Sequence, residues 1–183
     1  VVVIGAGPGG LEAARVAAER GHAVTVFEAQ PDPGGQIRLT VQNPRRAEMI
    51  SIIDWRMAQC AARDVEFRFN TWAEAADVTA LNPDVVIVAT GGMPNSMLHE
   101  TREEATNVVT SWDIISGDVK PGTNVLIYDE SGDHPGLMAA EVAANAGSTV
   151  EVMTPDRTFA PDIMGMNLVP YMRALQDKDV TFT

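Results

Sequence analysis

The chain has 183 residues, of which 45% are hydrophobic, and its 25 acidic and 13 basic side chains give a formal net charge of −12 at pH 7. The length predicts one large domain or two halves of one, and the acidic balance argues against a nucleic-acid partner. No apolar run approaches the roughly 20 residues of a membrane span, no secretory signal is present, and the single cysteine excludes an internal disulfide, so we expect a cytoplasmic protein with no membrane partner.

The first ten residues, VVVIGAGPGG, predict a strand that enters a glycine turn, and the alanine-rich residues 11–20 predict the helix that follows. Gly5 would permit the tight turn, Gly7 would let a pyrophosphate approach the backbone, and Gly10 would let the helix lie close to the strand. The N–H groups and dipole of that helix would face the phosphates. Because the chain begins inside a strand and without methionine, we also expect it to be a fragment of a longer protein.

A second strand is predicted at residues 22–27, and it ends at Glu28, where a carboxylate can accept hydrogen bonds from a ribose. Strand, turn, helix, strand and terminal acid together predict a dinucleotide-binding unit. The alternative is a strand–helix unit with an empty crevice. In the next segment, two prolines and two glycines exclude a helix over residues 31–35. The loop that contains Gly35 and Gln36 would then contact a longer cofactor at a second place. The alternative is an ordinary surface loop.

A long helix is predicted at about residues 46–63, because apolar side chains recur there at helical spacing. Cys60 lies on this stripe and is interpreted as a buried apolar residue rather than a nucleophile. Apolar and charged residues alternate over 65–69, which predicts a strand. Trp72, just after that strand, either lies over an adenine or is a packing residue. Residues 73–81 predict a short helix or an irregular segment.

The run at residues 84–92, DVVIVATGG, predicts a buried strand that the threonine and glycines end. Glycines at the carboxyl end of a parallel strand lie at the crevice where such sheets bind ligands. Residues 99–107 are polar and expected to be exposed. Residues 108–115 predict a short strand and a helical turn, and residues 119–122 a linker.

A second unit of the same type is predicted from strands at 124–128 and 149–153 with a helix at 135–146 between them. Its turn, residues 129–136, lacks the GxGxxG pattern. Three carboxylates, Asp129, Glu130 and Asp133, stand where a pyrophosphate would need open N–H groups, so we predict a solvated structural turn that accepts neither NADH nor NADPH. A loop at 161–166, a helix at 167–176 and a strand from 179 complete the chain.

These motifs, with PGGQ at 33–36 and VATGG at 88–92, resemble a flavoprotein with two dinucleotide-binding domains. More closely, the chain resembles the C-terminal part of trimethylamine dehydrogenase, 2,4-dienoyl-CoA reductase and related N-demethylating dehydrogenases. The resemblance extends over essentially the whole chain and is most specific over residues 1–115. It implies an α/β, Rossmann-like FAD/NAD(P)-binding fold of two nucleotide-fold units. Residues 1–118 would form the FAD- or ADP-binding domain and residues 119–183 an incomplete second unit.

The resemblance also implies the residues that hold the adenine dinucleotide. The pyrophosphate would be surrounded by Gly5, Gly7, Pro8, Gly9 and Gly10. The adenosine ribose would meet Glu28 and Ala29, the distal half would meet Gly35 and Gln36, and the crevice would be closed by Ala89, Thr90 and Gly91. No catalytic or metal-binding residue is expected in this segment, because its histidines are scattered and no acid–base pair is evident.

By the same resemblance, FMN and a 4Fe-4S cluster would be held upstream, in a flavin-bearing barrel of the same chain. The expected function is the nucleotide-binding part of a flavin-dependent oxidoreductase that oxidises a methylated amine or betaine. An electron-transfer flavoprotein would be the partner that accepts the electrons. Two alternatives remain: the cofactor portion of an NAD(P)H-dependent flavin reductase such as a dienoyl-CoA reductase, and a non-redox module with structural ADP. We expect the fragment alone to be inactive.

Overall fold

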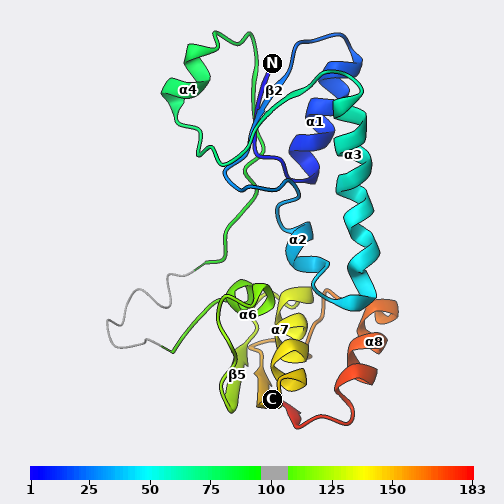
Figure 1. Ribbon diagram of the computed structural model, residues 1–183. Helices are drawn as coiled ribbons and strands as arrows, with labels where there is room; N and C mark the ends of the chain where they lie inside the picture. The colour runs from blue at the N-terminus through cyan, green and yellow to red at the C-terminus, as the bar shows by residue number, and fades with distance from the viewer. Residues whose placement is uncertain (96–106) are drawn as a thin grey trace. The chain divides into compact units, whose positions relative to one another are not determined.

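The computed structural model describes residues 1–95 and 107–183, which form two compact units, Val1–Met93 and Pro94–Thr183 (Figure 1). The expectation for residues 99–106 lies outside the described residues, and Asn107 is exposed. The division falls earlier than the boundary predicted at residue 118, because helix α6 (Ser111–Ser116) packs against a helix of the second unit. Among the residues that the structure describes, no helix has the length and apolar character needed to cross a bilayer.

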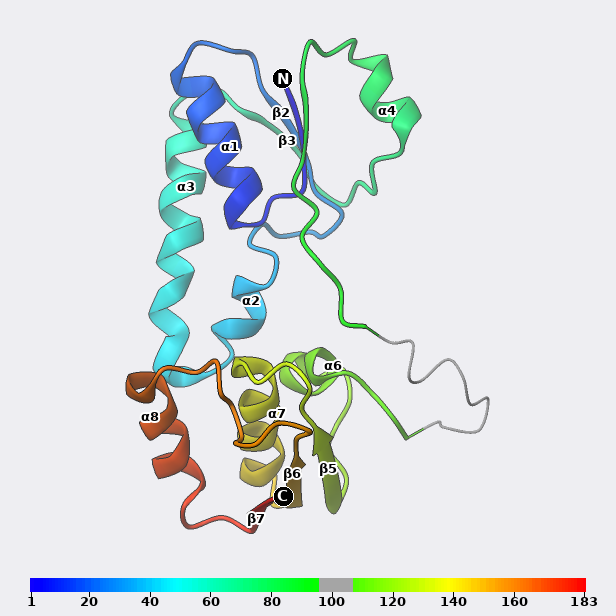
Figure 2. The same cartoon turned by 180° about the vertical axis from the view of Figure 1, so that it is seen from behind.

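The first unit is a parallel sheet with helices on both faces, which confirms the predicted α/β Rossmann-like fold. Its strand order is β3-β2-β1-β4, and the strands are β1 (Val2–Ile4), β2 (Thr25–Phe27), β3 (Glu66–Arg68) and β4 (Val86–Val88). Its helices are α1 (Pro8–Glu19), α2 (Ile37–Thr40), the 3-10 helix η1 (Pro44–Ile50), α3 (Ser51–Ala61) and α4 (Ala75–Ala80). Helices α1 and α3 lie side by side on one face of the sheet and α4 on the other (Figures 1 and 2).

The core of the first unit lies between its sheet and the pair α1 and α3. Fully buried members come from β1, β2, α1 and α3, and they include Val3, Val26, Leu11, Ile53 and Cys60. The predicted long helix is divided into η1 and α3, and Asn43 begins the first of them by accepting a hydrogen bond from the Arg45 N–H. The interpretation of Cys60 as a buried apolar residue is confirmed, since its side chain is 0% exposed.

Because it is buried, Cys60 should be unreactive in the folded protein. Burial raises the pKa of its thiol, so the folded state favours the neutral form. The unfolded chain releases this proton above an ordinary pKa of about 8.5, so the free energy of unfolding should be independent of this group below that pH and fall above it. We expect a chromogenic disulfide reagent to label the thiol in urea but not under native conditions. Rapid native labelling would contradict this.

Strand β4 departs from the prediction of a buried strand. It pairs with β1 on one side only and forms an edge of the described sheet. Two of its three side chains, Val86 and Val88, are exposed, the second at 70%, whereas Ile87 packs against the core. An apolar run cannot reveal whether a strand is central or at an edge, because that depends on the order of strands in the sheet.

The segment before α6 also departs from the prediction, because residues 108–110 form no strand. Thr110 is instead the N-cap of α6. Its hydroxyl accepts a hydrogen bond from the Asp113 N–H, and the Asp113 carboxylate accepts one from the Thr110 N–H at 2.8 Å. This reciprocal capping box fixes the start of the helix and uses the backbone groups that a strand would have needed.

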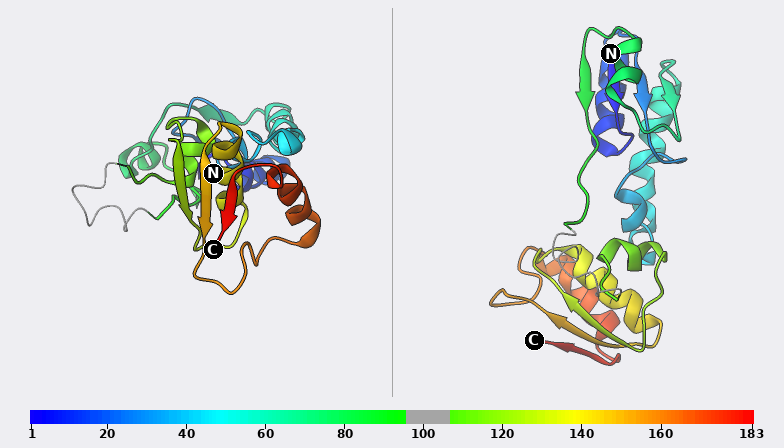
Figure 3. Two further views of the ribbon diagram at one scale, coloured as in Figure 1. Left: turned by 90° about the horizontal axis from the view of Figure 1, so that it is seen from below. Right: turned by 90° about the vertical axis from the view of Figure 1, so that its left-hand side faces the viewer.

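The second unit is a three-stranded parallel sheet with strand order β5-β6-β7. Its strands are β5 (Asn124–Tyr128), β6 (Thr149–Met153) and β7 (Val180–Phe182), and its longer helices are α7 (His134–Asn145) and α8 (Gly165–Leu175). Figure 3 shows α7 and α8 on one side of these strands. Alanines of α7 pack there against Val150, Val152 and Leu175, so the second nucleotide-fold unit has a core of its own.

Candidate nucleotide-binding site

The first glycine turn is built so tightly that two of its glycines leave no space for a side chain. A Cβ on Gly10 would overlap the carbonyl oxygen of Gly5, and a Cβ on Gly5 would overlap that of Ala89. Gly5 also has φ +101°, a left-handed value that favours glycine. These contacts bring α1 against the carboxyl ends of β1 and β4, as the fingerprint predicts.

At Gly7 and Gly9, by contrast, packing within the protein does not exclude a side chain. An added Cβ would meet no atom within 4 Å at either position. Gly7 is the N-cap of α1 with an ordinary φ of −69°, and Pro8 follows at a position where the missing N–H costs no intrahelical bond. The space above the first turn of α1 is therefore open. It is the place where the N–H groups and dipole of a helix attract an anion.

Glu28 joins the end of β2 to this turn. Its side chain is largely buried, at 9% exposure. One carboxylate oxygen accepts a hydrogen bond from the Ala6 N–H at 2.7 Å, and the other accepts one from the Gln30 N–H at 2.8 Å. Each oxygen can accept a further bond, so the carboxylate is still able to take ribose hydroxyl groups. Ala29 follows it at the strand end and is partly buried.

The loop that contains PGGQ is anchored to the same turn. The Gly34 N–H donates to the Ala6 carbonyl at 2.9 Å, and a Cβ on Gly35 would lie 3.4 Å from the Gly7 Cα. The Gln36 amide donates to the Gly92 carbonyl at 3.3 Å, so the loop also reaches the segment after β4. Gly35 and Gln36 remain exposed and able to contact a ligand.

The segment after β4 lies beside the same turn. The Ala89 N–H donates to the Ile4 carbonyl at 2.8 Å, and the chain then turns through Thr90 and Gly91, both exposed. Four predicted segments thus meet at the carboxyl edge of the first sheet: 5–10, 28–29, 35–36 and 89–91. Sequence reasoning missed the part played by Ala6 and Gly34, whose backbone groups tie the segments together. The only signal for them is their place inside the glycine motifs.

Trp72 lies near this edge but does not pack into the unit. Its side chain is 81% exposed, so the interpretation as a packing residue is wrong for the described chain. The Thr71 N–H donates to the Glu28 carbonyl at 2.8 Å, which places Trp72 one residue from the backbone of the predicted ribose acid. Asn70, with φ +54°, makes the turn that brings it there.

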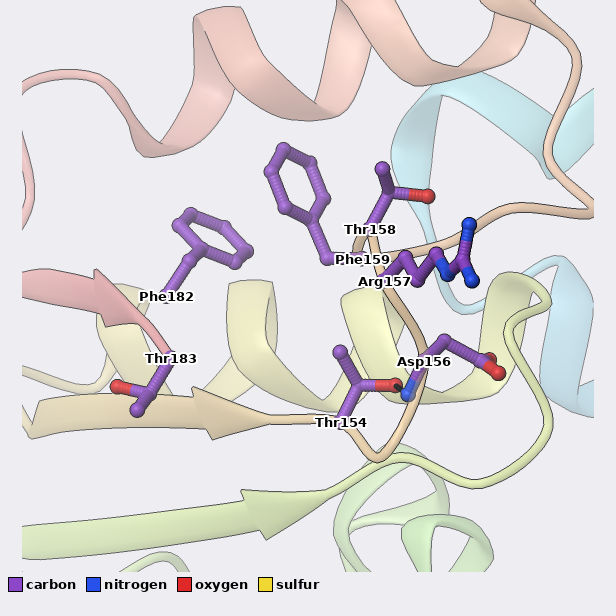
Figure 4. A pocket seen from close by; sticks show the side chains of 7 residues that line it. All are labelled: Thr154, Asp156, Arg157, Thr158, Phe159, Phe182 and Thr183. Atoms are coloured by element: carbon purple, nitrogen blue, oxygen red, sulfur yellow. Dashed lines mark hydrogen bonds between the residues drawn. The ribbon is translucent and has the colours of Figure 1, made fainter.

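The second unit has a small pocket at the carboxyl ends of β6 and β7 (Figure 4). Its volume is about 270 Å³, and its lining consists of Thr154, Asp156, Arg157, Thr158, Phe159, Phe182 and Thr183. The rings of Phe159 and Phe182, 4.5 Å apart, form its apolar side. The pocket contains none of the predicted nucleotide-binding residues.

Comparison with known proteins gives a family match within the first unit and relatives that match the whole chain. The family profile described as NAD(P)-binding Rossmann-like domain matches residues 3–57. The chain is 67% identical over 183 residues to a probable N-methylproline demethylase of Rhizobium meliloti (strain 1021). It is 43% identical over 188 residues to an N,N-dimethylglycine/sarcosine dehydrogenase of Chromohalobacter salexigens. All of this chain is matched in both cases, but it spans only 27% of the length of each relative.

Among solved structures, a 2-naphthoyl-CoA reductase in complex with 2-naphthoyl-CoA is similar with a TM-score of 0.86 and 30% identity. The match covers 100% of this chain and 27% of that one. The chain is thus similar to one part of much longer oxidoreductases.

Proposed function

Because the chain belongs to the trimethylamine dehydrogenase and 2,4-dienoyl-CoA reductase family, as a nucleotide-binding region, we propose that its first unit holds FAD or ADP within a flavin-dependent oxidoreductase acting on an N-methylated amine. The observation that carries this proposal is the meeting of four segments around the open face of Gly7. The activities for which the two relatives are named, N-methylproline demethylase and dimethylglycine/sarcosine dehydrogenase, support the substrate class.

The residues of this crevice fit an adenine nucleotide. The pyrophosphate would lie over Gly7 and Gly9, where the backbone has space, and would face the N-terminus of α1. Ribose hydroxyl groups would donate to Glu28, beside Ala29, and Trp72 would lie against the adenine. The distal half would pass Gly35, Gln36 and the segment 89–91, and FAD would supply the redox chemistry when bound.

The other redox groups would be held elsewhere in the protein. This chain has a single cysteine, which is buried in the core, whereas a 4Fe-4S cluster needs several cysteine thiolates. We therefore assign FMN and the cluster to a barrel in another part of the longer protein. We also propose that an electron-transfer flavoprotein accepts the electrons.

One observation favours a second candidate, an NAD(P)H-dependent flavin reductase. It is the structural similarity to a 2-naphthoyl-CoA reductase. The two candidates differ in the source of electrons. One takes them from an N-methylated amine and the other from a pyridine nucleotide.

The test uses the full-length protein. Nucleotides released by heat would be identified by absorbance and mass, and we expect FAD or ADP in addition to FMN. The anaerobic enzyme would then be mixed with dimethylglycine, sarcosine or N-methylproline, and separately with NADH. We expect rapid flavin reduction by one of the amines and not by NADH. Rapid reduction at micromolar NADH would favour the reductase, and release of no adenine nucleotide would contradict the site itself.

Trp72 should report adenine binding. Stacking of a base on an aromatic side chain contributes about 1–3 kcal/mol, so we expect Trp72→Ala to weaken ADP binding about tenfold or more. Trp72→Phe keeps an aromatic face and should keep most of the affinity. It should also abolish the quenching of tryptophan fluorescence that ADP causes in the parent protein. If Trp72→Ala binds ADP as tightly as the parent in a calorimetric titration, the base does not stack there.

A further inference from the structure

The turn between β5 and α7 occupies the place of a second nucleotide turn, but it is built differently from the first. Three residues, 5 to 7, connect β1 to α1, whereas five residues, 129 to 133, connect β5 to α7. Both helices have a glycine as their third residue, Gly10 in α1 and Gly136 in α7. The two glycines differ in which group lies where a Cβ would be.

The centre of the second turn is the carboxylate of Asp129, at the end of β5. Its side chain is 5% exposed, so the expectation of a solvated turn is wrong for this residue, although Glu130 and Asp133 are exposed as expected. Its Oδ1 accepts hydrogen bonds from the Ser131 N–H at 3.0 Å, the Gly132 N–H at 3.2 Å and the Ser131 hydroxyl at 2.8 Å. One oxygen of a buried anion thus holds three donors of the turn.

The glycine in α7 makes space for this carboxylate. A Cβ on Gly136 would lie 2.7 Å from both the Cγ and the Oδ2 of Asp129. At the equivalent point of the first unit, Gly10 instead admits the backbone carbonyl of Gly5. Gly136 therefore lets the Asp129 side chain lie against the first turn of α7, at the place that the Gly5 carbonyl takes beside α1 in the first unit.

The outer side of the same turn is also covered. Gly132 has φ +63°, and a Cβ there would lie 2.7 Å from the Pro161 Cδ. The Asp162 N–H donates to the Gly132 carbonyl at 3.0 Å and holds the covering loop in place. The contrast with Gly7 is direct, because that residue has no neighbour within 4 Å of an added Cβ.

We propose that Asp129 is an intramolecular anion that takes the hydrogen-bond donors of the second turn, which a phosphate would otherwise use, and so closes this unit to dinucleotides. The other two acids of the turn do not close it. The Asp133 carboxylate accepts from the His134 N–H at 2.7 Å and caps α7, and Glu130 is exposed. The barrier is therefore occupancy by one side chain rather than the summed repulsion of three carboxylates.

Inorganic phosphate is the probe that tests this, in the full-length protein with Gly7→Val to block the first turn. Two double variants are compared by calorimetry at constant ionic strength, one with Asp129→Gly added and one with Glu130→Gln added. The Asp129→Gly variant should bind one phosphate about tenfold or more tightly, because the donors of the turn are then available for charge-assisted hydrogen bonds. Asp129→Asn keeps the space filled without the charge and should not bind. Equal binding by the Gly and Asn variants, or by the Gly and Glu130→Gln variants, would overturn the proposal.

A second measurement tests the proposal without the Asp129→Gly variant, which could fold poorly. Asp129→Ser is shorter and neutral, and its hydroxyl can still accept a bond from the turn. Gly136→Ala should lower the melting temperature of the parent, because its Cβ meets the carboxylate. In the Asp129→Ser background the same change should cost little or raise it, since alanine favours a helix. An identical shift in both backgrounds would show that Gly136 does not serve to admit Asp129.

Discussion

Replacing Gly7 by valine is expected to abolish the binding of ADP and FAD while leaving the fold of the first unit intact. Gly7 has an ordinary φ, and an added Cβ would touch no atom within 4 Å, so the folded state can accept the larger side chain. The same space is where the proposed pyrophosphate meets the backbone. A valine there would hold the phosphates away from the N–H groups of α1.

The measurement is a thermal-shift titration of the 183-residue chain. A ligand that binds only the folded state stabilises it by about 2.7 kcal/mol at a hundred times its dissociation constant, so the parent should melt at a clearly higher temperature with ADP. Gly7→Val should melt like the parent without ligand and show no shift. Gly165→Val is the matched control, because Gly165 opens α8 with equally free surroundings. A full shift in Gly7→Val would contradict the assignment of the pyrophosphate.

Gly10→Ala is expected to destabilise the first unit by at least the 1–3 kcal/mol typical of an overpacked core, because its Cβ would overlap the Gly5 carbonyl oxygen. The Cβ of Ala89 would also lie 3.3 Å away, so the backbone itself must move. The direction of the change in the free energy of unfolding is informative, since alanine in place of glycine inside a helix normally stabilises by about 1 kcal/mol.

Gly9→Ala is the matched control for this prediction. It lies one residue earlier in the same helix and has open space around the added Cβ. Urea unfolding should give Gly9→Ala a free energy of unfolding equal to or above that of the parent, and Gly10→Ala a much lower one. If the two variants unfold alike, the close contact between α1 and the turn is not what the glycine serves.

Much of the first unit could be predicted because its signals are local. The strand, the glycines and Glu28 occur within one short stretch, and each has a steric or hydrogen-bonding reason that holds in any fold that contains the motif. The burial of Cys60 followed from helical periodicity. The meeting of segments 35–36 and 89–91 with the turn was expected from the resemblance, and the structure adds the bonds of Ala6 and Gly92 that join them.

The features that could not be predicted depend on contacts between segments that are distant in the sequence. Val88 belongs to an apolar run, and only the order of strands leaves it at an edge. The exposure of Trp72 depends on the turn at Asn70, and the burial of Asp129 on donors that become available only when the loop closes. Composition alone suggested a solvated cluster of acids, because it does not record which carboxylate turns inward.

The bridge from Glu28 to Ala6 has a consequence for the kinetics and thermodynamics of binding. The acid that would receive the ribose already fixes the turn that would receive the phosphates, so the conformational entropy of ordering that turn is lost during folding and not on association. A nucleotide would then meet a preorganised surface, and its association rate should follow diffusion and charge rather than loop closure. Affinity differences among crevice variants should consequently appear mainly in the rate at which the nucleotide leaves.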